Sequence, residues 1–260
     1  MEVATALAAH QYNLVLCASN SEEQEMENLK RLVQGKTVDG VIVVRTRLND
    51  ERVRYLQEKG LPFVCHGKTE DSLPYCFVES DGEKGIKLAT GRLVRFGHRR
   101  IAWIGNHRNQ YATKVRLQGY KTALAMYGIE SDEELCSFGP ITKANGKSAA
   151  ERLLDLPNPP TAFVCASDIL ALGAMEAVRS RGLTVGKDIS VIGYDDFPVA
   201  EMMVPALTSV NSNFRLMGKM LAEFIYKRIE GAPVEELQTV TDVSISSRLS
   251  DGPANEAGTT

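Results

Sequence analysis

The sequence has few cysteines and no long apolar run. Its five cysteines are an odd number without a Cys-x-x-Cys pair, and Cys17, Cys65 and Cys165 lie inside apolar runs, as is typical of reduced cysteines in a protein core. No run approaches the ~18 apolar residues of a membrane-spanning helix. The first residues, MEVATALAAHQYN, lack the basic and apolar parts of a signal peptide. We therefore expect a soluble, cytoplasmic protein.

Sequence motifs of enzymes are missing as well. The triplet GKS at 146–148 is similar to the end of a phosphate-binding loop, but Ile141 stands where that loop needs its first glycine. There is no GxGxxG after an expected strand, no GxSxG and no HExxH. We expect no enzyme activity, no cofactor and no metal site, since the four histidines are scattered: His10, His66, His98 and His107.

The sequence also lacks an excess of positive charge. Its net charge of −3 gives no electrostatic reason to expect tight binding of nucleic acid. Any contact with DNA would therefore come from a segment outside this sequence. The length of 260 residues exceeds that of a usual single domain, which favours two lobes.

What the sequence does have is an alternation of short apolar runs and longer amphipathic segments. Apolar runs separated by helices of ten or more residues are typical of parallel sheets covered on both faces, so we expect an α/β fold. The expected strands are 13–19 (NLVLCAS), 40–44, 62–66, 76–80, 101–105, 161–167 and 189–194. The expected helices lie near 21–34, 50–59, 83–96, 112–127, 145–155, 168–181 and 214–230.

A weak internal repeat supports two lobes of similar build. Residues 38–67 and residues 160–196 both follow the order strand, loop, helix, glycine and strand. In each segment the helix ends in a basic residue followed by Gly-Leu, which is Lys59-Gly60-Leu61 in the first and Arg181-Gly182-Leu183 in the second. These glycines are expected to cap the helices, and the cations suit the negative helix ends.

Polar residues stand at the carboxyl ends of three of the expected strands, at 79–81, at Ser167 and Asp168, and at 194–196. In open α/β sheets the ligand crevice lies beyond the carboxyl ends of the strands. Asp195 therefore stands where an acid could accept hydrogen bonds from ligand hydroxyls. Alternatives remain open, because Asp is a common turn former and Asp168 could simply cap the helix that follows it.

Two further residues have both a structural and a functional interpretation. Arg116 lies near the start of a helix, where its guanidinium could contact two hydroxyls or a carboxylate, or could belong to a solvated helix face. Phe77 lies within an expected strand, where it could belong to the core or stack its ring on a sugar.

Several segments in this order together resemble the effector-binding core of the LacI/GalR-type transcriptional regulators. They are GHRRIAWIG, RLQGYKTAL, PTAFVCASDILALGAMEAVRSRGLTVGKDISVIGYDDFP and PALTSVNSNFRLMGKMLAEFIYKRIEG, and the resemblance extends from residue 3 to about residue 249. It implies two Rossmann-like lobes joined by three crossovers, like a type I periplasmic binding protein. The first lobe would hold 1–78 and 211–240, and the second 79–210 and 241–249. The polar tail 250–260 is expected to be disordered.

The resemblance also implies roles for single residues in binding an effector between the lobes. Asp195 matches the acid that accepts hydroxyl protons, Arg116 the arginine that grips the effector, and Phe77 the stacking aromatic. Ser167, followed by Asp168, stands where many members have Asn in an Ala-Asn-Asp pattern. Ile141 replaces a frequent aromatic, and Gly67 replaces a frequent Asp. Asp196 is assigned to the turn before Pro198.

The resemblance implies a homodimer and a function in transcription. Met202, Met203 and Val204 match a segment at the family's subunit interface. Members carry about sixty residues of DNA-binding domain and hinge before this core, and the core opens with a strand. Here the sequence begins inside the helix that follows this strand, and we expect a gap in the first sheet with unpaired edges.

The leading hypothesis is therefore the effector-sensing core of a cytoplasmic transcriptional regulator, with a small sugar as the expected class of effector. The DNA-binding domain is not part of this sequence, so operator DNA would be a partner only through that domain. The alternative hypothesis is the solute-binding receptor of a sugar transport system, which shares the fold but usually works as a monomer. Related regulators also bind purines and phosphorylated sugars.

Overall fold

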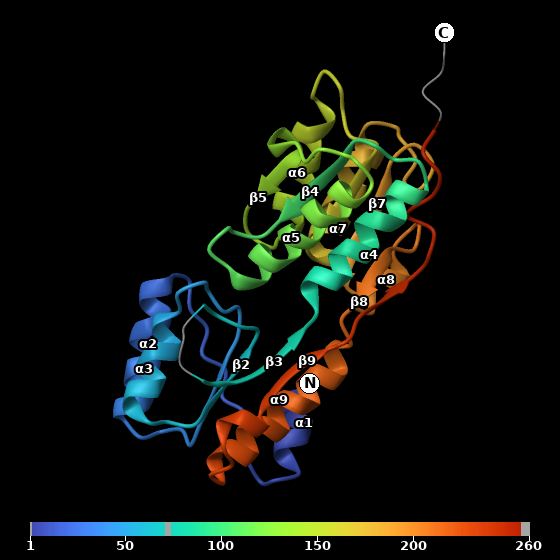
Figure 1. The fold of residues 1–260 in the computed structure, drawn as a ribbon. Helices are drawn as coiled ribbons and strands as arrows, with labels where there is room; N and C mark the ends of the chain where they lie inside the picture. Colours follow the sequence, from blue (N-terminus) through green and yellow to red (C-terminus); the bar gives the residue numbers. More distant parts are fainter. Residues whose placement is uncertain (1, 71–73, 256–260) are drawn as a thin grey trace. The chain divides into compact units, whose positions relative to one another are not determined.

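The computed structural model describes residues 2–70 and 74–255, and it divides into two compact units (Figure 1). The first unit comprises residues 1–80, 110–112 and 214–241. The second unit comprises residues 81–109, 113–213 and 242–260. Each unit is an α/β structure built on its own sheet, as the alternation of apolar runs predicted. Among the described residues, no helix is both long and apolar enough to cross a bilayer.

The first unit contains a parallel sheet of four strands in the order β1-β2-β3-β9. The strands are β1 (Val41–Val43), β2 (Phe63–His66), β3 (Cys76–Ser80) and β9 (Gln238–Thr241). The helices are α1 (Glu2–Ala8), α2 (Glu22–Gln34), α3 (Glu51–Lys59) and α9 (Phe214–Ile229). Helix α9 packs on β1, β2 and β3, and α1 packs on α9.

Local signals in the sequence fix the helices of the first unit. The hydroxyl of Ser21 accepts a hydrogen bond from the N–H of Gln24 and begins α2, and the carboxylate of Asp50 begins α3 in the same way. Gly60 ends α3 with a positive φ of 65°, which glycine adopts without steric cost. This is the cap that the Lys-Gly-Leu pattern predicts.

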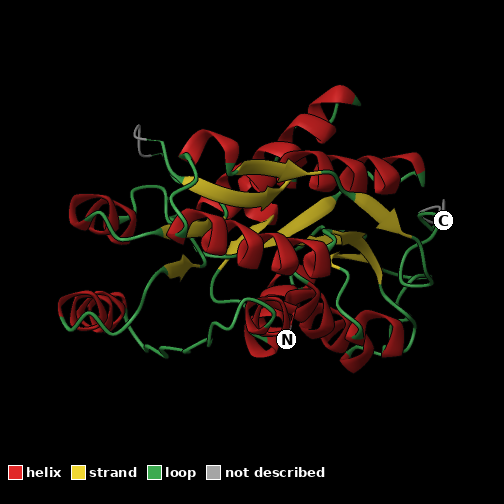
Figure 2. Ribbon diagram, turned by 90° about the horizontal axis from the view of Figure 1, so that it is seen from below, coloured by secondary structure: helices red, strands yellow, loops and turns green. Residues whose placement is uncertain are grey.

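The second unit contains a sheet of six strands in the order β10-β8-β7-β6-β4-β5. They are β4 (Ile101–Gly105), β5 (Cys136–Phe138), β6 (Ala162–Cys165), β7 (Ser190–Asp195), β8 (Thr208–Asn211) and β10 (Ser244–Ser246). All pairs are parallel except β8 with β10. The helices are α4 (Gly82–Arg95), α5 (Tyr111–Met126), α6 (Lys143–Leu154), α7 (Asp168–Ser180) and α8 (Val199–Met202). Figure 2 shows the helices flanking the strands, as expected for sheets with continuous apolar runs.

The core of the second unit is large and closely packed. Trp103, Phe163 and Ile192 come from three neighbouring strands and are fully buried. The buried Tyr120 hydroxyl donates to the carbonyl of Ile101 at 2.7 Å, so this polar atom is satisfied. Helices α6 and α7 approach closely at Gly173, where a Cβ atom would lie 2.1 Å from the carbonyl oxygen of Lys143. The rigid core fixes the ends of β6 and β7, where the candidate site lies.

The prediction of a strand at residues 13–19 is wrong. Residues 13–19 form no strand, and Val15 and Leu16 are 66% and 87% exposed. An apolar run becomes a strand only when another strand pairs with it. Among the described strands, β1 pairs only with β2.

The prediction of a disordered tail is also wrong for residues 250–255, which are ordered. Residues 256–260 of that predicted segment lie outside the described part. Ser250 is fully buried, and its hydroxyl donates to the carbonyl of Val191 at 2.6 Å. The carboxylate of Asp251 accepts from Arg92 and Thr208. Polar composition suggested disorder, but these polar groups pair with buried partners that are distant in sequence.

Candidate functional site

The candidate site lies at the carboxyl ends of β6 and β7 in the second unit. Nη1 of Arg116 donates to the carbonyl of Ala166 at 2.7 Å, just beyond the end of β6. Nη2 of Arg116 lies 3.9 Å from Oδ1 of Asp195, the last residue of β7. The guanidinium lies over the ring of Tyr194, with Cζ 3.6 Å from the ring centroid. A cation, a carboxylate and an aromatic ring are thus brought together from α5 and β7.

The backbone after β7 is held in an unusual conformation. Asp195 and Asp196 have positive φ angles of 105° and 57°, a region in which Asp is among the few tolerated residues other than glycine. Asp196 accepts hydrogen bonds from Asn211, Ser246 and Arg248 at 3.0, 2.6 and 2.7 Å. The second acid of the pair therefore anchors the turn, as the sequence indicated. The first acid is left to face Arg116.

The environment of Asp195 shifts its proton affinity. Although 21% of its side chain is exposed, burial raises the pKa of the Asp195 carboxyl to about 6. Arg116 and a hydrogen bond from Ser167 act in the opposite direction and lower this pKa. The ionised carboxylate is therefore held in a poorly hydrated place, where hydroxyl donors from a ligand would stabilise it.

Arg116 has hydrogen-bonding capacity left over. Its side chain is 15% exposed, and its buried Nε has no hydrogen-bond partner among the described residues. A guanidinium that is mostly withdrawn from water, with a free donor next to a carboxylate, is suited to grip a ligand with several oxygens. The platform of this guanidinium is the ring of Tyr194, for which the sequence predicted no separate role.

The neighbouring residues Ser167 and Asp168 differ in their surroundings, because Ser167 contacts Asp195 and Asp168 is buried. Ser167 is the N-cap of α7, its hydroxyl accepts from the N–H of Ile169 at 3.3 Å, and it hydrogen-bonds Asp195. The predicted site role of Asp168 does not fit the structure, because this side chain is fully buried. It accepts from the hydroxyl of Ser209 at 2.5 Å and from the N–H of Phe197 at 2.8 Å.

The burial of Asp168 has two consequences. It raises the pKa of the carboxyl to about 7, although the two hydrogen bonds lower it. It also requires Gly193 in the neighbouring strand, because a Cβ atom there would lie 2.3 Å from Oδ1 of Asp168. The carboxyl thus supports the turn after β7 and takes no direct part in the candidate site.

The other predicted site residues are more scattered. Ile141 lies in the loop that follows β5 and is 39% exposed. Phe77 lies within β3 of the first unit, half-buried, and Nζ of Lys68 lies 4.8 Å from its ring centroid. Their parts in ligand binding remain predictions from the resemblance.

The predicted interface segment is exposed at two of its three residues. Met202, at the end of α8, and Val204 are both 79% exposed. Met203 is 8% exposed and belongs to the core of the second unit, and the part of these three residues in a subunit interface stays a prediction. Met203 and Val204 follow the last residue of α8, and the three neighbouring side chains differ in exposure.

Within residues 2–70 and 74–255, no group of three or more His, Cys, Asp or Glu side chains is arranged to hold a metal ion. His98 is buried, and its ring contacts Thr161, Ser190 and the carbonyl of Gly252. This histidine therefore links α4 to the C-terminal segment.

Comparison with known proteins gives a consistent result. The model of the periplasmic binding protein-like domain matches residues 90–250. The transcriptional regulator CelR of Thermobifida fusca is 36% identical over 252 residues, which are 95% of this chain and 73% of that protein. The regulator AglR of Rhizobium meliloti is 33% identical and covers 94% of this chain, which in turn covers 70% of AglR.

Solved structures agree with the sequence relatives. The complex of the transcriptional regulator CelR with cellobiose is 35% identical with a TM-score of 0.88, and the match covers 96% of this chain and 76% of that one. A putative transcriptional regulator LacI from Bacillus cereus is 26% identical with a TM-score of 0.91, and the match covers 98% of this chain and 92% of that one. The similarity therefore extends over nearly the whole chain.

Proposed function

Because this chain belongs to the LacI family of transcriptional regulators, we propose that it is an effector-sensing core which binds a small sugar at the Asp195–Arg116 cluster. The observation that carries the proposal is the position of Arg116, over Tyr194 and beside Asp195, with its buried Nε unpartnered among the described residues. In this arrangement Asp195 accepts hydrogen bonds from sugar hydroxyls and Arg116 donates to sugar oxygens. Ser167 holds the Asp195 carboxylate in place.

A sugar suits this chemistry because it offers many hydroxyl groups that both donate and accept. A mostly buried carboxylate and guanidinium rank among the stronger hydrogen-bonding groups, since charge-assisted bonds are roughly twice as strong as neutral ones. The structure of the similar CelR contains cellobiose. Cellobiose and other glucosides are therefore the first ligands to test, with Phe77 and Ile141 as the apolar surfaces that would contact a sugar ring.

The signal from the effector would act on a DNA-binding domain. We propose that effector binding changes the relative stability of two states of the core, and that the difference in affinity for these states is what alters operator binding. The core would act as a cytoplasmic homodimer, with Met202 and Val204 in the subunit interface. A transport receptor is the less favoured alternative, since the relatives are transcriptional regulators.

A thermal-shift screen tests the proposal. The chain is melted with mono- and disaccharides, purines and sugar phosphates, alongside the variants Asp195→Ala and Asp155→Ala. Asp155 is an exposed acid of the same unit, which makes it a matched control. A ligand present at a hundred times its Kd should stabilise the native state by about 2.7 kcal/mol.

We expect a sugar to raise the melting temperature of the wild type and of Asp155→Ala but not that of Asp195→Ala. A shift with purines or sugar phosphates alone would contradict the sugar class. A sugar shift that persists in Asp195→Ala would contradict the site.

A further inference from the structure

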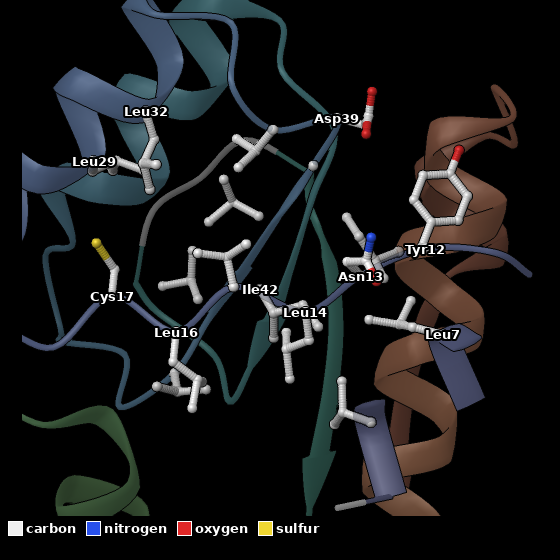
Figure 3. A pocket seen from close by; sticks show the side chains of 18 of the residues that line it. Leu7, Tyr12, Asn13, Leu14, Leu16, Cys17, Leu29, Leu32, Asp39 and Ile42 are labelled. Atoms are coloured by element: carbon white, nitrogen blue, oxygen red, sulfur yellow. The ribbon is translucent and has the colours of Figure 1, made fainter. Parts of the chain in front are cut away.

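The first unit contains a cavity of about 700 Å³ with mostly apolar walls, among them Leu7, Leu29 and Ile42 (Figure 3). The charged groups at its margin pair with each other, since Nη1 of Arg52 lies 2.8 Å from Oε1 of Glu25. Such walls offer the hydroxyl groups of a sugar few hydrogen-bond partners. Further determinants of sugar binding are therefore expected around the turn after β7 in the second unit.

The turn after β7 is strained at Asp195. Its φ angle of 105° lies well outside the left-handed helical region, which extends over about 50–70°, whereas Asp196 at 57° lies within that region. A side chain held in a sparsely populated region costs free energy, and the conformation persists only where the surrounding contacts impose it. The contacts that hold this turn are therefore needed to keep Asp195 in place, although they need not touch a ligand.

The carboxylate of Asp196 connects this turn to three side chains. Oδ2 accepts from the neutral donors Asn211 and Ser246, and Oδ1 accepts from Nη1 of Arg248 at 2.7 Å. The side chains of Asp196 and Arg248 are only 9% and 14% exposed. A charge-assisted bond is roughly twice as strong as a neutral one, so Arg248 is the strongest of the three partners.

Arg248 is itself fixed to buried residues of the second unit. Its backbone N–H donates to Oγ1 of Thr208, and its Nη1 also donates to the carbonyl of Leu207, both at 2.8 Å. Thr208 and Leu207 are fully buried, and Thr208 is the first residue of β8, which pairs with β7. The guanidinium thus ties the turn to residues that cannot move easily.

The backbone of the turn has a second support that does not involve Arg248. The N–H of Asp196 donates to the hydroxyl of Ser209 at 3.2 Å. The next N–H, that of Phe197, donates to the carboxylate of Asp168 at 2.8 Å. These bonds leave the charge of Asp196 uncompensated. Without Arg248 this mostly buried carboxylate would lack its cation, and a rotation toward water would relieve both the buried charge and the strained backbone.

We propose that Arg248 is a positioning residue of the sugar site. Through the carboxylate of Asp196 it holds Asp195 in the orientation that faces Arg116. This role rests on the proposed function, because it concerns the same site. The guanidinium forms its ion pairs with Asp196 and Glu201, so its effect on a ligand passes through the turn.

Amide hydrogen exchange, followed by NMR, tests the hold on the turn without a ligand. Arg248→Gln removes the cation, and it should increase the exchange rates of the Asp196 and Phe197 amides at least about tenfold. Glu201→Gln changes the other partner of the same arginine, a side chain that is 73% exposed, and should leave both rates unchanged. Unchanged rates in Arg248→Gln would overturn the proposal, whatever the result with sugars.

Calorimetric titration with cellobiose, the sugar in the structure of the similar CelR, measures the effect on binding. Arg248→Gln should weaken binding at least about tenfold. Arg248→Lys keeps the charge, and it should recover most of the affinity because the bond to Asp196 uses a single nitrogen.

Arg92→Gln is the matched control for lost stability, because Arg92 pairs with the buried carboxylate of Asp251 in the same unit. It should lower the melting temperature but leave the affinity for cellobiose and the exchange at the turn unchanged. Equal losses of affinity in Arg92→Gln and Arg248→Gln would overturn the proposal, since they would reflect stability alone.

A double-mutant cycle shows whether the effect passes through Asp196. Asp196→Asn removes the charge that Arg248 compensates, so Arg248→Gln should weaken binding only about twofold or less in that background. The double variant has no uncompensated charge at this place, so it should fold even if Arg248→Gln alone does not. A further tenfold loss in the Asp196→Asn background would overturn the positioning role.

Failure of the proposed function has a different signature. If the wild type binds no cellobiose while Arg248→Gln exchanges faster at the turn, the proposed sugar fails and the hold of Arg248 on the turn is supported. If the wild type and Arg248→Gln bind cellobiose equally well, the proposed function stands and the positioning role is overturned.

Discussion

Arg116 and Tyr194 form a stacked pair, with the guanidinium carbon 3.6 Å from the ring centroid. The ring comes from the middle of a buried sheet and cannot move easily, so it fixes the plane of the guanidinium. Fixing a long side chain before a ligand arrives lowers the entropy that binding must overcome. The pair thus explains how one helix residue can serve as a preorganised donor beside Asp195.

The first prediction concerns the planar shape of the Arg116 guanidinium. Arg116→Lys keeps the charge but loses the planar donor fork and its stacking on Tyr194. We expect sugar affinity to fall at least tenfold, which corresponds to about 1.4 kcal/mol. Calorimetric titration measures this loss, and Arg181→Lys, at an exposed arginine of the same unit, is the matched control. Equal affinities for wild type and Arg116→Lys would exclude Arg116 from the binding site.

The second prediction concerns pH. The Asp195 carboxyl has a pKa raised to about 6, and only its ionised form accepts two hydroxyl donors freely. Sugar affinity should therefore fall as pH drops through about 6, and should be about tenfold weaker at pH 5 than at pH 8. In Asp195→Asn this dependence should disappear along with most of the affinity. A titration series from pH 5 to pH 8 checks it, and a flat wild-type profile would contradict it.

The third prediction concerns stability and the buried acid Asp168. Burial raises its pKa to about 7 from an ordinary value of 3.8. Between these values the native state binds a proton that the unfolded state lacks, so the free energy of unfolding should decrease as pH rises. The expected slope is about 1.4 kcal/mol per pH unit from this group.

The variant Asp168→Asn resembles the protonated carboxyl and can still hydrogen-bond Ser209 and the N–H of Phe197. It should flatten the decrease in stability between pH 4 and pH 7. Denaturant unfolding at several pH values provides the measurement. The same slope in both proteins would show that Asp168 is ionised throughout this range.

The fourth prediction concerns the C-terminal segment. The carboxylate of Asp251 is fully buried against Arg92 and Thr208. Asp251→Ala leaves Arg92 without this partner and should destabilise the second unit by about 3 kcal/mol. Asp155→Ala, at an exposed acid of the same unit, should cost far less. Similar melting temperatures for wild type and Asp251→Ala would mean that the tail is not part of the folded unit.

The fifth prediction concerns assembly. Met202→Asp places a charge on a side chain that is 79% exposed and belongs to the proposed dimer interface. The dimer dissociation constant should rise at least about tenfold, because an unpaired charge would be buried. Met126→Asp, at a methionine that is 64% exposed at the end of α5, is the control. Sedimentation equilibrium measures both, and an unchanged constant for Met202→Asp would place the interface elsewhere.

The sequence predicted well those elements whose signals are local. The strands at 76–80 and 101–105 have the predicted bounds, and α2 and α3 differ from theirs by one residue at the start, because apolar runs, caps and glycines lie within the segments themselves. The fold class followed from the same alternation, and the family from the order of several motifs.

The wrong predictions concern residues whose contact partners lie far away in the sequence. Residues 13–19 have a strand sequence without a partner strand, Asp168 is satisfied by Ser209 from another strand, and Asp251 is held by Arg92. Tyr194 was overlooked as a platform because its neighbour Arg116 lies 78 positions earlier in the chain. Such pairs depend on the packing of the whole unit and leave no local pattern.

The most direct test of the central claim is a calorimetric titration of cellobiose, or of the best sugar from the thermal screen, into three proteins at neutral pH. They are the wild type, Asp195→Asn and the surface control Asp155→Asn. If the Asp195–Arg116 cluster binds the effector, Asp195→Asn should lose at least tenfold in affinity while the control equals the wild type. Equal affinity in all three proteins, with the same melting temperature, would contradict the assignment of the effector site to this cluster.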